Sequence, residues 1–137
     1  MEKFKKILIS FSAFVFLIVF GAFSLFLPKD KNKKENLQIL TIGENQFLVE
    51  VAADVLSQAR GLSGRENLPE NQGMLFIFNE SAVRSFWMAG MKFPIDIIWI
   101  KGDRIIGILE NLLPANRMDV ELYNSPEPVD KVLEINA

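Results

Sequence analysis

Four side chains in this sequence could together bind a ligand. Arg60 and Arg65 flank a glycine-containing turn, and Trp87 and Asp96 lie in residues 73–100, a stretch that contains two continuous apolar runs. Arginine presents a planar fork of donors to carboxylates or sugar hydroxyls, and an indole face stacks on a sugar or a peptide. A carboxylate between two isoleucines must find donors or stay at a rim. We therefore expect these four residues to converge at the rim of a ligand-binding site.

The same residues can also have purely structural roles, and we favour this interpretation over a binding site. An ion pair of Arg60 or Arg65 with Asp96 would pin a helix to a sheet, and Trp87 would fill the core. Loss of Asp96 would then cost about 3 kcal/mol if the pair is buried, but under about 1 kcal/mol at an open rim. We assign structural roles to Trp99 and Glu134.

Residues suited to catalysis or metal binding are few. The chain has neither cysteine nor histidine, which removes thiolate and imidazole chemistry and the commonest transition-metal ligands. Asp96 and Glu134 could form a carboxylate pair acting on a glycosidic bond, and a serine–lysine pair could be drawn from Ser81, Ser85 and Lys92. We expect no metal and no cofactor. Carboxylate-dependent hydrolysis of envelope carbohydrate is kept as the enzymatic alternative.

The first 27 residues predict a membrane anchor. Residues 7–27 carry no charge, contain only three serines as polar side chains and follow three lysines. A helix of about 20 apolar residues spans the hydrocarbon core of a bilayer. Ala22-Phe23-Ser24 is a poor signal-peptidase site, so we expect an uncleaved anchor, with secretion after cleavage as the alternative. A short N-terminal tail favours a domain outside the cytoplasm.

A charged linker, residues 28–36, separates this segment from a single domain at residues 37–137. The domain has eight basic and fourteen acidic residues, a net charge of 8 − 14 = −6. That charge repels phosphate backbones, so the sequence argues against nucleic acid as a partner.

From residue 37 onward the hydrophobic pattern predicts strands with one short helix. Two continuous apolar runs, 74–78 and 97–100, predict strands buried on both faces at the centre of a sheet, because a strand with one solvated face alternates with polar residues. Asp54 predicts the N-cap of a helix that ends near Arg60. Predicted hairpins join residues 37–42 to 47–51 and 97–100 to 104–110, and a last strand covers residues 129–135.

Six short motifs follow one another along the predicted domain. They are Arg60-Gly61-Leu62, Arg65, Gly73-Met74-Leu75-Phe76, Phe86-Trp87-Met88, Pro94-Ile95-Asp96-Ile97 and Val132-Leu133-Glu134. In this order they resemble the domain of unknown function 192 family, from about residue 46 to the end. The resemblance implies a small, mostly β domain, sandwich or barrel-like (jelly-roll-like), with a short helix and often exported. It implies no reaction.

Two departures from the family pattern bear on the site and the fold. Ala89-Gly90-Met91 stands where the family usually carries Lys-Asn-Thr, so any role of those polar groups is lost. The family also usually continues past Val-Leu-Glu with a glycine, a helical turn and a closing strand, whereas this sequence ends at Asn136-Ala137. Such an ending would fit a truncated chain, and we expect the last strand to leave the sheet with an open edge or a partly exposed apolar strip.

These observations lead to one functional hypothesis and two alternatives. We expect a membrane-anchored, extracytoplasmic, mainly β domain that binds a small polar ligand, a glycan or an envelope protein without chemical conversion. The alternatives are the hydrolase described above and a structural accessory subunit of a membrane complex.

Overall fold

The computed structural model describes residues 37–115 and 121–137, which belong to one compact unit, Glu35–Ala137. This part of the chain is mainly β with one short helix, as the hydrophobic pattern predicted. Its elements in chain order are β1 (Leu37–Ile42), β2 (Asn45–Ala52), α2 (Val55–Arg60), β3 (Gln72–Ala82), β4 (Ser85–Phe86), β5 (Ile95–Lys101), β6 (Arg104–Leu112), β7 (Tyr123–Asn124) and β8 (Val129–Asn136).

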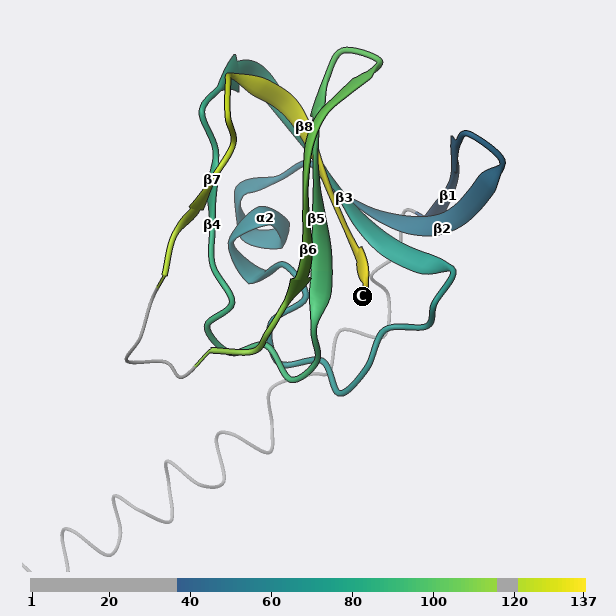
Figure 1. Cartoon of the computed structure of the whole chain (residues 1–137), viewed down its shortest axis with the longest axis vertical. Coiled ribbons are helices and arrows are strands. Elements are labelled where there is room, and N and C mark those ends of the chain that lie inside the picture. Colours follow the sequence, from purple (N-terminus) through teal and green to yellow (C-terminus); the bar gives the residue numbers. More distant parts are fainter. Residues whose placement is uncertain (1–36, 116–120) are drawn as a thin grey trace, which may run out of the picture. The chain divides into compact units, whose positions relative to one another are not determined.

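Six of the strands form one open sheet in the order β1-β2-β3-β8-β5-β6, and β4 pairs separately with β7. Neighbours in the large sheet are antiparallel except β2 and β3, which are parallel and are connected through α2. Figure 1 shows α2 between the β4–β7 pair and the large sheet. The sheet ends at β1 and β6, so the barrel-like closure that we expected from the family resemblance does not form.

The local predictions for the first hairpin and the helix are confirmed. β1 and β2 pair from Leu37 with Glu50 to Ile42 with Asn45, across a turn at Gly43. Asp54 caps α2, since its Oδ1 accepts hydrogen bonds from the backbone N–H groups of Leu56 and Ser57, each at 3.0 Å. The hydroxyl of Ser57 completes a capping box. Such a cap supplies acceptors to N–H groups that have no partner within the helix.

The two faces of the sheet bury separate apolar clusters, which explains the continuous apolar runs. Successive side chains of a strand point to opposite faces. On β3, Met74 and Phe76 therefore belong to the cluster that packs beneath α2, and Leu75 to the cluster on the other face. β5 behaves in the same way, with Trp99 fully buried on the first face and Ile98 on the second.

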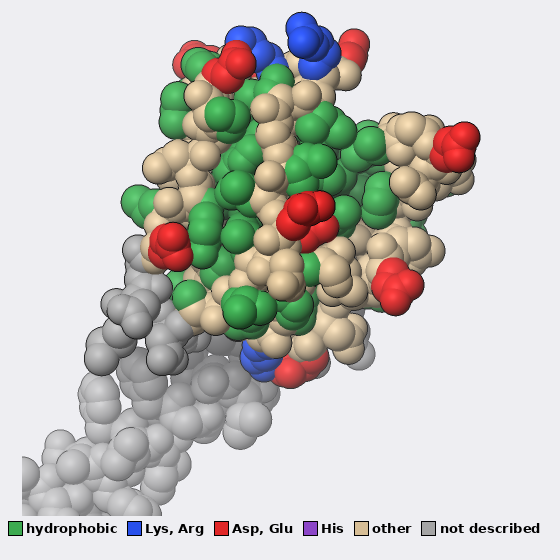
Figure 2. All heavy atoms as spheres, in the orientation of Figure 1, with side chains coloured by type: hydrophobic (Ala, Val, Ile, Leu, Met, Phe, Trp, Pro, Cys, Tyr) green, Lys and Arg blue, Asp and Glu red, His purple; other side chains and the backbone are tan. Residues whose placement is uncertain are grey.

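β8 lies at the centre of the sheet rather than at its edge. It pairs with β3 on one side and β5 on the other, so that Val132 lies between Phe76 and Trp99. The expectation that the last strand leaves an open edge is therefore wrong. The exposed edges are β1 and β6, and on β6 Ile105 and Ile108 are about half exposed. Figure 2 shows hydrophobic side chains covering much of the face in view, with Lys and Arg side chains seen only near its upper and lower ends.

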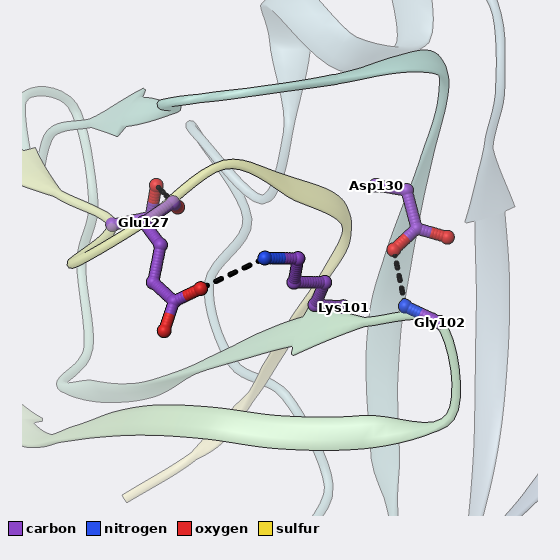
Figure 3. Close-up of polar contacts among 5 residues, drawn as sticks. Lys101, Gly102, Glu127 and Asp130 are labelled. Carbon is purple, nitrogen blue, oxygen red and sulfur yellow. Dashed lines mark hydrogen bonds and ion pairs between the residues drawn. The ribbon is translucent and has the colours of Figure 1, made fainter.

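The turn between β5 and β6 is fixed to the segment that leads into β8. Lys101 forms an ion pair with Glu127 at 2.8 Å, and the backbone N–H of Gly102 donates to Oδ1 of Asp130 at 2.7 Å (Figure 3). The hydrogen bond from Lys101 lowers the pKa of Glu127. The pKa of Asp130 is lowered first by its hydrogen bond from Lys131 and then by the one from Gly102. These contacts position the start of β8 between its two neighbours.

Within the described residues no helix has the length and apolar character needed to cross a bilayer. The predicted anchor, residues 7–27, and the predicted linker, residues 28–36, lie outside the described part of the chain.

Candidate functional site

A cavity of about 280 Å³ lies between the end of α2, the β4 segment and the large sheet, and we call it the α2 pocket. The helix end and the following turn form one wall, and the segment that carries β4 forms the opposite wall. β3 and β8 contribute from the sheet. The lining consists of residues 58–63, Phe76, Phe78, residues 83–87, Ala89, Met91 and Glu134.

Glu134 supplies the only carboxyl group of this lining, and it is buried. Only 5% of the residue is exposed, and its Oε2 atom has no hydrogen-bond partner among the described residues. Burial raises the pKa of Glu134 from 4.5 to about 8, and the positive charge of Arg65 opposes that shift. Burial disfavours the charged form of a carboxyl group, so at neutral pH Glu134 is largely protonated and can donate a hydrogen bond.

The end of α2 comes close to this carboxyl group because Gly61 follows the helix. Gly61 has a φ of +53°, which L side chains rarely adopt. A Cβ placed there would lie 3.5 Å from the ring of Phe76 and 3.9 Å from Oε2 of Glu134. Gly61 thus supplies the backbone conformation that ends the helix beside Glu134 and the fully buried Phe76.

Arg84 contributes a second polar atom without a partner. Its Nε atom is buried and unpaired among the described residues, while its Nη2 atom donates to the backbone carbonyl of Glu80. The guanidinium carbon lies 3.9 Å from the centroid of the Phe78 ring. Arg84 is thus held in place by a hydrogen bond and a cation–π contact, with one donor left over at the pocket.

Aromatic rings make up much of the remaining wall. Phe86 packs edge-to-face against Phe76, with ring centroids 4.9 Å apart and an interplanar angle of 89°, and against Trp99 at 5.6 Å and 76°. Trp87 lies at the mouth, where 49% of it is exposed. Arg60 is also exposed and lines the same cavity.

Backbone and side-chain hydrogen bonds fix the two walls. Gln58 donates from Nε2 to the carbonyl groups of Ala52 and Ile77, at 3.3 and 2.8 Å, and so ties α2 to β2 and β3. Across the rim, the N–H of Gly64 donates to the carbonyl of Gly90 at 3.0 Å. These hydrogen bonds hold α2 and the loop around Gly90 in place beside the pocket.

The structure brings together two of the four residues that we predicted for the site. Arg60 and Trp87 line the α2 pocket, whereas Arg65 and Asp96 do not. Arg65 forms an ion pair with Glu50, with Nη2 at 2.7 Å from Oε1 and 2.8 Å from Oε2. Asp96 accepts a hydrogen bond from the backbone N–H of Asn111 at 2.8 Å. The predicted tie of Asp96 to Arg60 or Arg65 is therefore absent from the described residues.

The two catalytic pairs that we considered are not assembled either. Asp96 pairs with Ile135 and the neighbouring Ile97 pairs with Glu134, which places the two carboxyl groups on opposite faces of the sheet. Ser85 donates to the side chain of Asn124 and Lys92 pairs with Glu66. Within the described residues no group of three acidic side chains could hold a metal ion.

Three residues of the α2 pocket were missed or given another role by the sequence analysis. Glu134 was assigned to structure, and Arg84 and Phe86 were not proposed for the site. One signal for Glu134 was available, since it is the single charge in the apolar run 132–135 and a charge there must face a partner, a ligand or a pocket. Arg84 carried no such signal, because it lies next to Ser85 and not within a continuous apolar run.

Two crystal structures resemble this fold. One is a protein of unknown function from Novosphingobium aromaticivorans, with 32% sequence identity and a TM-score of 0.65, covering 74% of this chain and 71% of that one. The other is a Sinorhizobium meliloti protein described as a candidate transcription regulator, with 33% identity and a TM-score of 0.64, covering 74% of this chain and 78% of that one. No curated protein matches the sequence.

The family model of domain of unknown function 192, described as "Uncharacterized ACR", matches residues 38–137, which include every residue that lines the α2 pocket. The chain therefore belongs to the domain of unknown function 192 family.

Proposed function

We propose that this domain binds a small polar ligand in the α2 pocket and does not convert it chemically. The observation that carries the proposal is the buried carboxyl group of Glu134 in the lining of the cavity, with its Oε2 atom unpaired among the described residues. A buried polar group without a hydrogen-bond partner costs about 1–3 kcal/mol. A ligand that hydrogen-bonds to Glu134 removes this cost, and that gain favours binding.

The composition of the pocket supports binding over hydrolysis. Ligand sites are concave, mostly apolar, and carry a few polar groups that fix orientation, and here aromatic walls surround Glu134, Arg60 and Arg84. Hydrolysis of a glycosidic bond by the usual route needs two carboxyl groups about 5–10 Å apart. Glu134 is the one carboxyl group in the described lining.

A fragment screen with a matched pair of variants tests the proposal. The full-length protein, kept in solution with a mild non-ionic detergent, is screened by ligand-detected NMR against neutral, cationic and anionic fragments. Ala59→Phe adds a ring at a residue that lines the pocket, whereas Val55→Phe adds one to the same helix at a residue that is 80% exposed and outside the lining.

We expect fragments that bind the wild type and the Val55→Phe variant and lose binding in the Ala59→Phe variant. The proposal is wrong if no fragment binds, or if every fragment that binds is unaffected by Ala59→Phe.

We also propose that residues 7–27 anchor the domain to a membrane and that the domain lies outside the cytoplasm. The support is the uncharged length of that segment. The chain should remain in the membrane fraction after alkaline carbonate extraction. Release of a soluble form that begins near Leu25 would show instead that the segment is a cleaved signal.

A further inference from the structure

We infer that the α2 pocket selects small organic anions that carry a flat, unsaturated ring, aromatic carboxylates being the simplest members of this class. This inference rests on the proposed function of the pocket and adds the charge and the shape of the ligand.

The charge of the lining favours an anion. Arg60 and Arg84 are its two cationic residues and Glu134 is its one acidic residue. Burial keeps Glu134 largely protonated at neutral pH, because its pKa is raised to about 8. The described lining then carries a positive charge that no carboxylate of the pocket offsets. A ligand carboxylate supplies the missing negative charge.

Arg84 offers the most specific contact for that carboxylate. One of its terminal nitrogen atoms is already used by the carbonyl of Glu80, and its guanidinium plane is held against Phe78. The Nε atom is buried and lacks an acceptor among the described residues. A hydrogen bond from a guanidinium to a carboxylate is stronger than one between neutral groups, so a ligand carboxylate that draws the Arg84 guanidinium toward the pocket satisfies the donor that the fold leaves unpaired.

The walls of the pocket fit a flat ring. Phe76 and Phe86 meet edge-to-face within the lining, and the exposed indole of Trp87 lies at the mouth. Aromatic rings prefer offset-stacked or edge-to-face partners with centroids 4.5–7 Å apart. A ligand ring packed against the outer side of this aromatic wall makes such contacts, whereas a bulky saturated ligand does not.

Glu134 offers a second polar contact to the ligand. A protonated carboxyl group donates one hydrogen bond and retains acceptor capacity. Because its Oε2 atom lacks a partner among the described residues, a ligand that carries a hydroxyl group as well as a carboxylate has a polar group for each of the two side chains. The compound 4-hydroxybenzoate carries both groups and is a suitable probe.

Isothermal titration calorimetry on the full-length protein at pH 6.5 tests the inference with three probes of the same size. They are the anion 4-hydroxybenzoate, the neutral 4-hydroxybenzamide and the cation 4-hydroxybenzylamine. We expect 4-hydroxybenzoate to bind at least tenfold more tightly than the amide, and the amine not to bind measurably.

Arginine variants separate recognition of charge from general loss of binding. Arg84→Gln and Arg60→Gln should each weaken 4-hydroxybenzoate at least threefold and leave the amide affinity unchanged. Arg104→Gln, on the exposed edge strand β6 and outside the lining, is the control and should have no effect. If Arg84→Gln does not fold, the exposed Arg60 still provides the test.

Each other result overturns the inference. Equal or tighter binding of the amide or the amine means that the pocket does not select anions, and the proposed binding function then stands alone. The same holds if none of the three probes binds while the fragment screen finds other ligands. If the screen also finds none, the proposed function fails together with the inference.

Discussion

Gly73 lies against the backbone of Glu134 where β3 and β8 pair: a Cβ built at Gly73 would be 2.6 Å from the carbonyl oxygen of Glu134. It would also lie 3.0 and 3.2 Å from the side chains of Ile135 and Leu133. The first of these distances is shorter than side-chain carbons tolerate, and the obstructing atom belongs to the backbone. The absence of a side chain at Gly73 is thus a condition for the position that Glu134 takes in the α2 pocket.

Replacement of Gly73 by alanine should destabilise the domain by about 1–3 kcal/mol, because the added methyl group forces the two central strands apart. Urea denaturation of the full-length protein measures the loss. Asn79→Ala, at an exposed position of the same strand, is the control and should change stability by less than about 0.5 kcal/mol. A loss no larger than that of the control would show that the strands adjust without cost.

Stability should fall as pH rises from about 4.5 to about 8, and Glu134→Gln should remove this part of the pH dependence. The pKa of Glu134 is raised by burial from 4.5 to about 8, so over this window the folded state holds a proton that the unfolded state has lost. The free energy of unfolding then decreases by up to about 1.4 kcal/mol per pH unit. Below pH 4.5 and above pH 8 the group contributes no slope.

Urea denaturation of the wild type and the Glu134→Gln variant at pH 5.5 and pH 7.5 checks this expectation. The difference between the two pH values should be smaller in the variant. An equal difference in both proteins would mean that Glu134 does not titrate in this range.

Arg65→Met should raise the pKa of Glu134 further, because the charge of Arg65 is the one influence that lowers it. The ¹³C chemical shift of the Glu134 carboxyl group, followed by NMR against pH, measures the change. Stability should fall by less than about 1 kcal/mol, since the pair of Arg65 with Glu50 is partly exposed, at 35% and 18% of the two side chains. Arg104→Met is the control, and an unchanged or lowered pKa in Arg65→Met would contradict the expectation.

Asp54→Ala should cost about 1 kcal/mol, because the first N–H groups of α2 lose the acceptors that Asp54 provides. Thermal unfolding detected by circular dichroism measures the loss. Asp54→Asn retains a capping oxygen and should recover most of the stability. If the asparagine variant is as unstable as the alanine variant, the negative charge of Asp54 matters more than the cap.

Elements with local signals could be predicted from the sequence. The pair β1 and β2, the pair β5 and β6, and the capped helix α2 each form between neighbouring residues around a turn or cap. The placement of β8 between β3 and β5 could not be predicted, because it joins residues more than thirty positions apart along the chain. The hydrophobic pattern of residues 129–135 predicted a strand but did not show whether that strand lies at the centre or at the edge of the sheet. The family pattern suggested that another strand would follow it.

The candidate site, like the fold, could be predicted from the sequence only in part. Arg60 and Trp87 were predicted from residue type and do line the α2 pocket. Arg65 is five residues from Arg60, yet it faces Glu50 on β2, which a sequence without pairing information cannot reveal. Glu134 was assigned a structural role, whereas the structure places it in the pocket lining with its Oε2 atom unpaired among the described residues.

The central position of β8 has a consequence for the synthesis of the chain. β3 and β5 leave the ribosome first, and the strand that must separate them is made after both. Until residues 129–136 emerge, the backbone groups of β3 and β5 that later pair with β8 have no hydrogen-bond partners. The two strands can then pair incorrectly, including with each other. The large sheet can therefore be completed only when β8 inserts between them, after nearly the whole domain has been made.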